Sequence, residues 1–106
     1  MGRELHGSAD FLSDFHRAST ILEGAVHDLL ASGWDEHCRR RAHQLAVALT
    51  DAAKASGWKE TGGVVQAIAS LLALSVGEVI GVREALRERL LELLDVLKDS
   101  PASESA

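Results

Sequence analysis

The stretch FLSDFHRASTILEGAVHDLLASGW, residues 11–34, carries the clearest helical pattern of this chain. Its apolar positions recur at spacings of four and three, at Phe11, Phe15, Ala18, Leu22, Ala25 and Leu29. This spacing places them on one stripe of a helix with 3.6 residues per turn. Ser32 and Gly33 end the pattern, because glycine readily takes the left-handed conformation of a helix C-cap. The stretch therefore predicts an amphipathic helix from Ser8 to Ser32.

The tripeptide Ser-Gly-Trp closes this stretch at residues 32–34 and recurs at residues 56–58. Between the two copies, Asp35 is the predicted N-cap of a second helix that runs to about Ser56. The same four-three spacing predicts its inward stripe to be Cys38, Ala42, Leu45, Leu49 and Ala52. Each tripeptide combines a glycine stop with an indole that can cover one end of a helical bundle.

Two more helices are predicted in the second half of the chain. Thr61-Gly62-Gly63 precedes the first of them, which runs to about Leu74 and is apolar or small nearly all round. Ser75 and Glu78 form a capping box for the last helix. The inward positions of that helix are predicted to be Val79, Val82, Leu86, Leu90, Leu93 and Leu97.

These four segments predict an all-α fold, an antiparallel four-helix bundle that forms a single domain over residues 1–106. Only one proline, two tryptophans and two phenylalanines occur in the chain, too few for a β-sandwich or barrel. A length of 106 residues is enough for one core and too short for a separate catalytic domain. The two ends, residues 1–7 and 99–106, are expected to be disordered.

The composition of the chain limits the classes of partner and the cellular location that are expected for it. The net charge is −5, and the only basic cluster is Arg39, Arg40 and Arg41, so no nucleic-acid or membrane surface is expected. The single cysteine, Cys38, cannot form an internal disulfide, which favours the cytoplasm. The most apolar stretch, residues 64–76, contains Gln66 and two serines and falls short of the roughly 20 residues of a membrane span. No cofactor motif is present, so no cofactor is expected.

His43 is the strongest candidate for chemistry. The predicted stripe of the second helix places it roughly 130° from the buried face, which predicts an exposed side chain. An imidazole is nucleophilic when neutral, and it is largely neutral at pH 7. The guanidinium groups of Arg39 and Arg40 pair well with phosphate oxygens. These residues therefore suit a phosphate acceptor, although the geometry alone favours a solvated helix face with no function.

The wider string LLASGWDEHCRRRAHQL, residues 29–45, resembles the histidine-phosphotransfer (HPt) domains of bacterial two-component phosphorelays. In that family a glycine and often a tryptophan, here Gly33 and Trp34, precede a helix with the pattern A-H-x-L, here Ala42, His43 and Leu45. The resemblance implies a four-helix bundle that docks receiver or histidine kinase domains. It also implies that His43 accepts a phosphoryl group from a receiver aspartate and relays it.

The chain departs from the family pattern directly after His43. The family continues H-x-L-K-G, whereas Ala46 stands at the lysine position and Val47 at the glycine position. Two versions of the prediction remain open. Either His43 is phosphorylated with Arg39 or Arg40 replacing the lysine, or the bundle docks partners without transfer. In both versions Gln44 and Val47 contribute docking surface.

Other readings of the sequence point to different classes of function. His37, Cys38 and His43 lie close in sequence, but Cys38 is predicted to point inward and His43 outward, so no metal site is expected. No hydrolase or metabolic activity is expected, because no nucleophile elbow or phosphate-binding loop occurs. The rival hypothesis is a helical interaction module without chemistry, which forms a homodimer through the helix at residues 64–74.

Overall fold

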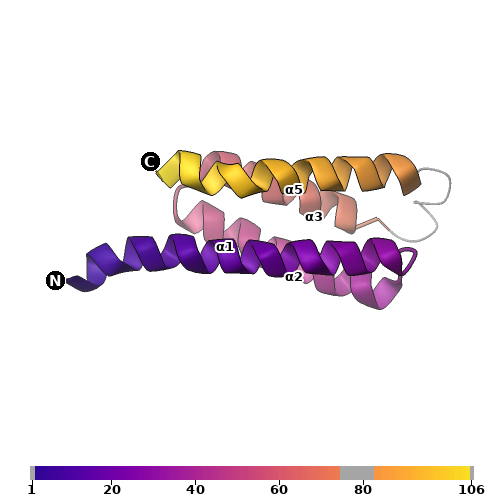
Figure 1. Cartoon of the computed structure of the whole chain (residues 1–106), viewed down its shortest axis with the longest axis horizontal. Helices are drawn as coiled ribbons and strands as arrows, with labels where there is room; N and C mark the ends of the chain where they lie inside the picture. Colours follow the sequence, from indigo (N-terminus) through magenta and orange to yellow (C-terminus); the bar gives the residue numbers. More distant parts are fainter. Residues whose placement is uncertain (1, 75–82, 106) are drawn as a thin grey trace.

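The computed structural model describes residues 2–74 and 83–105, and the side chains of residues 12–74 and 84–101 within them. The described ranges form four helices, α1 (Gly2–Ala31), α2 (Glu36–Ala55), α3 (Lys59–Leu72) and α5 (Arg83–Ser105). Figure 1 shows successive helices running in opposite directions, with the N- and C-terminal ends at the same end of an elongated molecule. The predicted all-α bundle is confirmed. The predicted capping box at Ser75 and Glu78 lies outside the described residues.

The core is formed by one face of each helix. Each helix packs against the next one, and α5 closes the bundle against α1. Most predicted inward positions with described side chains are buried, including Phe15, Leu22, Ala25 and Leu29 of α1 and Leu86, Leu90, Leu93 and Leu97 of α5. Burying one such large side chain contributes about 1.5–3 kcal/mol, so these aliphatic stripes stabilise the bundle more than any of its polar contacts.

Both Ser-Gly-Trp tripeptides end a helix as predicted. Gly33 and Gly57 have positive φ angles of 75° and 78°, the conformation that favours glycine. The amide of each following tryptophan donates to a carbonyl five residues back, Trp34 to Leu29 and Trp58 to Ala53, both at 2.9 Å. The α1–α2 and α2–α3 connections, which carry Trp34 and Trp58, lie at opposite ends of the bundle (Figure 1). Trp34 is buried, and Trp58 packs edge-on against Phe15, with ring centroids 5.3 Å apart.

The ends of the chain differ from the expected disorder, since α1 begins at Gly2 and α5 continues to Ser105. At the end of α5, Ser100 and Pro101 are buried, and the Ser100 hydroxyl donates to the Val96 carbonyl at 3.0 Å. Proline removes one helical hydrogen bond, and this packing offsets that loss. Residues 3–5, Arg-Glu-Leu, are good helix formers, and no proline occurs before them to stop α1.

Thr61, Gly62 and Gly63 lie inside α3, so their predicted place before the helix is wrong. Gly62 is buried, and a Cβ atom there would lie 3.4 Å from Lys54 Cγ and 3.7 Å from Ala53 Cβ. The glycine therefore serves the close approach of α2 and α3 rather than a turn. In a sequence pattern, glycine predicts a turn or a helix end. The pattern contains no information about a contact between two helices.

Gly63→Ala is expected to raise the free energy of unfolding by about 0.5–1 kcal/mol, because alanine favours the helical backbone. Gly63 is exposed, and a Cβ atom there meets nothing within 4 Å. Urea unfolding followed by circular dichroism measures the change. Gly57→Ala is the control and should lower stability, because its φ of 78° strains alanine. A Gly63→Ala variant less stable than the parent would contradict the helical assignment.

Candidate functional site on helix α2

The buried face of α2 is rotated relative to the sequence prediction. Its buried residues are Ala42, Ala46, Leu49, Thr50 and Ala53. Leu45 and Ala52, which were predicted to point inward, are only half-buried. The observed face is centred about 75° from His43 rather than roughly 130°. His43 is accordingly half-buried, and the prediction of full exposure is wrong.

Small residues and one hydrogen bond explain this rotation. Alanine packs on any face of a helix, so Ala46 and Ala53 turn inward and let α3 approach closely. Thr50 is buried without an unmet polar group, because its hydroxyl donates to the Ala46 carbonyl at 2.8 Å. A hydrophobicity pattern gives more weight to Leu45 than to either alanine, and it counts Thr50 as polar.

His43 lies on the flank of α2 that faces α3. Arg39, one turn earlier on the same flank, donates from Nη1 to the Leu72 carbonyl of α3 at 2.8 Å. At the other end of that flank, Lys54 Cγ approaches the Gly62 position of α3. Within the described part of the chain, the His43 ring has no hydrogen-bond or ion-pair partner. The fold therefore leaves both ring nitrogens available.

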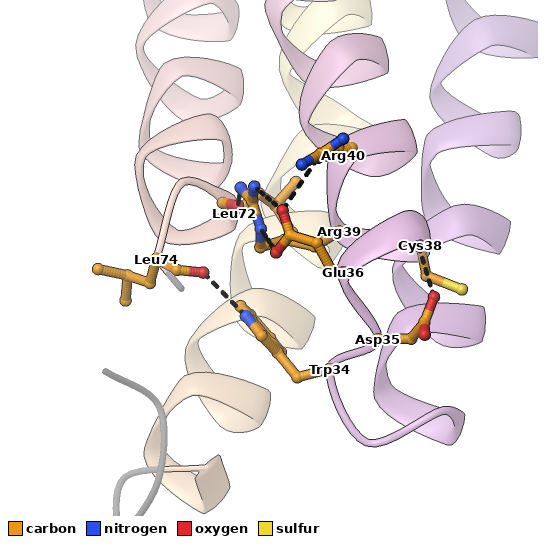
Figure 2. A network of polar contacts seen from close by, with 8 residues as sticks. All are labelled: Trp34, Asp35, Glu36, Cys38, Arg39, Arg40, Leu72 and Leu74. Carbon is orange, nitrogen blue, oxygen red and sulfur yellow. Dashed lines mark hydrogen bonds and ion pairs between the residues drawn. The ribbon is translucent and has the colours of Figure 1, made fainter. Parts of the chain in front are cut away.

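Arg39 is held within the protein, whereas Arg40 is largely in solvent. The Nε and Nη2 atoms of Arg39 donate to the two carboxylate oxygens of Glu36 at 2.9 and 2.6 Å. Its side chain is only 16% exposed, compared with 71% for Arg40, which donates from Nε to Glu36 at 3.0 Å. Figure 2 shows this network where α2 begins. Of the two predicted phosphate-binding arginines, Arg40 is the more exposed, and Glu36 is its one hydrogen-bond partner among the described residues.

Glu36 organises this network by accepting hydrogen bonds from both arginines, a role that was not predicted from the sequence. The guanidinium of Arg39, and after it that of Arg40, lowers the pKa of Glu36 to about 2, while the Glu36 carboxylate raises the pKa of Arg39. The sequence does contain a signal for this network, because Glu36 precedes Arg39 by three residues and Arg40 by four, the spacings of ion pairs along a helix. Asp35 acts as the predicted N-cap, and its carboxylate accepts from the Cys38 amide at 3.1 Å.

Glu36→Gln is expected to lower stability at neutral pH and to lose this effect in acid. Since the pKa of Glu36 falls from 4.5 to about 2 on folding, its carboxylate stabilises the fold above pH 4.5 and stops doing so as the pH falls to 2. Urea midpoints of parent and variant should therefore converge over this range. Glu92→Gln removes the exposed pair with Arg89 and is the matched control. A difference in urea midpoint between the parent and Glu36→Gln that does not change with pH would contradict the lowered pKa of Glu36.

The outer surface of α2 carries the other predicted site residues. Gln44 is exposed, and Val47, one turn after His43, is 40% exposed. Ala46, at the lysine position of the HPt pattern, is fully buried. On the opposite flank, α2 and α1 enclose a groove of about 210 Å³ lined by Asp14, Phe15, Ala18, Leu45, Ala48, Leu49 and Ala52. The structure therefore brings His43, Gln44 and Val47 together and keeps position 46 away from them.

Cys38 and His43 lie on different sides of α2. Cys38 is half-buried on the α1 side of α2, and His43 lies on the α3 side, so the two cannot converge on one ion. Among the described residues, no three His, Cys, Asp or Glu side chains are grouped to hold a metal. The described helices also include none that is long and apolar enough to cross a membrane.

Comparisons of the chain with protein families, curated proteins and solved structures found no match.

Proposed function

We propose that this bundle is an HPt-like signalling module that docks a receiver domain on α2 and accepts a phosphoryl group on His43. The observation that carries the proposal is the state of the His43 ring. It is half-buried on α2, has no hydrogen-bond or ion-pair partner among the described residues, and lies one turn from the exposed Val47. A side chain that the fold does not use, next to exposed apolar surface, is suited to a partner-dependent role.

The proposed chemistry is a direct transfer between two side chains. A neutral imidazole nitrogen of His43 attacks the phosphorus of the receiver's aspartyl phosphate, an N–P bond forms, and the aspartate leaves as a carboxylate. Arg40 is the cation that can follow the phosphoryl group, because its side chain is 71% exposed. It replaces the lysine of the family pattern, which the buried position 46 cannot provide.

The docking surface extends over both flanks of α2. A stable interface covers about 800 Å² on each partner, a patch wider than one helix of 10–12 Å diameter. A receiver centred on Gln44 and Val47 therefore reaches His43 on one side and the apolar groove with α1 on the other. This arrangement supplies apolar contact beside the reacting ring.

Val47→Glu is expected to weaken receiver binding about tenfold or more, because it places a charge in the centre of an apolar contact. Val96→Glu is the matched control, since Val96 is similarly exposed, at 46%, but lies on α5. Titration calorimetry with phosphorylated receivers compares the two variants. Equal affinities for both variants would contradict docking on α2.

We do not extend the proposal to a homodimer through residues 64–74. In α3 the large apolar residues Val65, Ile68 and Leu72 are buried in the core of the single chain. The exposed residues of the 64–74 segment, Gln66, Ser70 and Ala73, are small or polar. They offer little apolar area for a second chain, so sedimentation should give the mass of one chain at micromolar concentration.

A further inference from the structure

Two side chains from the beginning of α2 and its preceding turn hold the end of α3. Arg39 Nη1 donates to the Leu72 carbonyl at 2.8 Å, and the indole Nε1 of Trp34 donates to the Leu74 carbonyl at 3.0 Å. Figure 2 shows the two contacts side by side. The last carbonyls of a helix have no partners within it, so these bonds fix where α3 ends against α2.

Arg39 divides its guanidinium between a charged and a neutral acceptor. Its Nε and Nη2 atoms bind the Glu36 carboxylate, whereas Nη1 binds the neutral Leu72 carbonyl. His43 follows one turn later, about 40° further round the helix. Helical side chains lean toward the N-terminus, so the His43 ring leans back toward the turn that carries Arg39.

We propose that Arg39 senses phosphorylation of His43 and transmits it to the end of α3. A phosphoryl group on His43 draws Nη1 of Arg39 away from the Leu72 carbonyl, because a charged phosphoryl oxygen is a stronger acceptor than a neutral carbonyl. The end of α3 then loosens, together with the Trp34 indole that binds Leu74. This inference rests on the proposed function, in which His43 is the phosphate acceptor, and it makes Arg39 a positioning residue.

Chemical phosphorylation tests the inference without a protein partner. Phosphoramidate reacts with imidazole: an N–P bond forms at the ring, the P–N bond of the reagent breaks, and ammonia leaves. The parent and His43→Gln are treated alike, and phosphate on His43 is verified by mass spectrometry. In ¹H–¹⁵N spectra of the parent, the Trp34 indole resonance should shift and its solvent exchange should accelerate about fivefold. The Trp58 indole is the internal control and should not change.

Two arginine variants test whether Arg39 connects His43 with the Trp34 indole. Arg39→Gln should show the altered Trp34 resonance before phosphorylation and little further change after it. Arg89→Gln is the control, because Arg89 forms an exposed ion pair with Glu92 on α5, away from His43, and it should respond like the parent. The parent and His43→Gln both keep Arg39. Their comparison therefore shows whether phosphate on His43 changes the Trp34 resonance, even if Arg39→Gln lowers stability.

Three results would overturn the inference: no phosphate on His43, an unchanged Trp34 resonance in the phosphorylated parent, or an equal response in Arg39→Gln. The failure of this coupling is distinguishable from a failure of the proposed function. Phosphoryl transfer from a receiver to His43, with no change in the Trp34 indole resonance, would refute only the coupling. A Trp34 response to phosphoramidate without transfer from any receiver would refute only the proposed function.

Discussion

Trp34→Ala is expected to lower the free energy of unfolding by about 3–5 kcal/mol, the usual cost of removing a large side chain from a core. Trp34 is 1% exposed, and its indole nitrogen donates to the Leu74 carbonyl across 40 residues of sequence. The substitution leaves a cavity at the end of the bundle and a carbonyl without its partner. Urea unfolding followed by circular dichroism measures the loss.

Further variants separate the contributions of the side chain and the backbone at this position. Trp34 has a φ of 71°, which costs any residue other than glycine about 1–2 kcal/mol. Trp34→Gly should therefore be more stable than Trp34→Ala, although both lose the indole. Trp58→Ala removes a half-buried indole and should cost less than Trp34→Ala. Equal losses at the two tryptophans would contradict the buried position of Trp34.

Ala46→Lys, which restores the lysine of the HPt pattern, is expected to destabilise the bundle by roughly 3–5 kcal/mol. Ala46 is fully buried, and its carbonyl accepts the hydroxyl of Thr50. A lysine there brings an unpaired charge and additional volume into the interface of α2 with the core. The family lysine therefore cannot be added at this position without loss of stability.

Ala48→Lys is the matched control, because Ala48 is an exposed alanine two residues further along the same helix. A surface substitution of this kind changes stability by about 0.5 kcal/mol or less. Thermal unfolding of the two lysine variants therefore compares the inward and outward faces of α2. Similar melting temperatures would place residue 46 on the surface beside His43, as in the family pattern, and would contradict the rotation of α2.

The sequence predicts the helices and their ends better than the orientation of α2. Glycine stops, the Asp35 cap and the leucine stripe of α5 are local signals, and they agree with the structure. The rotation of α2 depends on alanines, which are compatible with either face until α3 packs against them. The binding of Arg39 to Leu72 and the packing of Gly62 against Ala53 join distant segments. No spacing along the chain encodes such contacts, so the arginine was expected at a phosphate rather than at a helix end.

A transfer assay shows whether His43 receives a phosphoryl group from a receiver. The parent chain, His43→Gln and His27→Gln are incubated with radiolabelled phosphorylated receiver domains from the organism that encodes the chain. His27 is an exposed histidine on α1 and serves as the control. We expect acid-labile label on the parent and on His27→Gln and none on His43→Gln. Label that survives the loss of His43, or no label from any receiver, would contradict it.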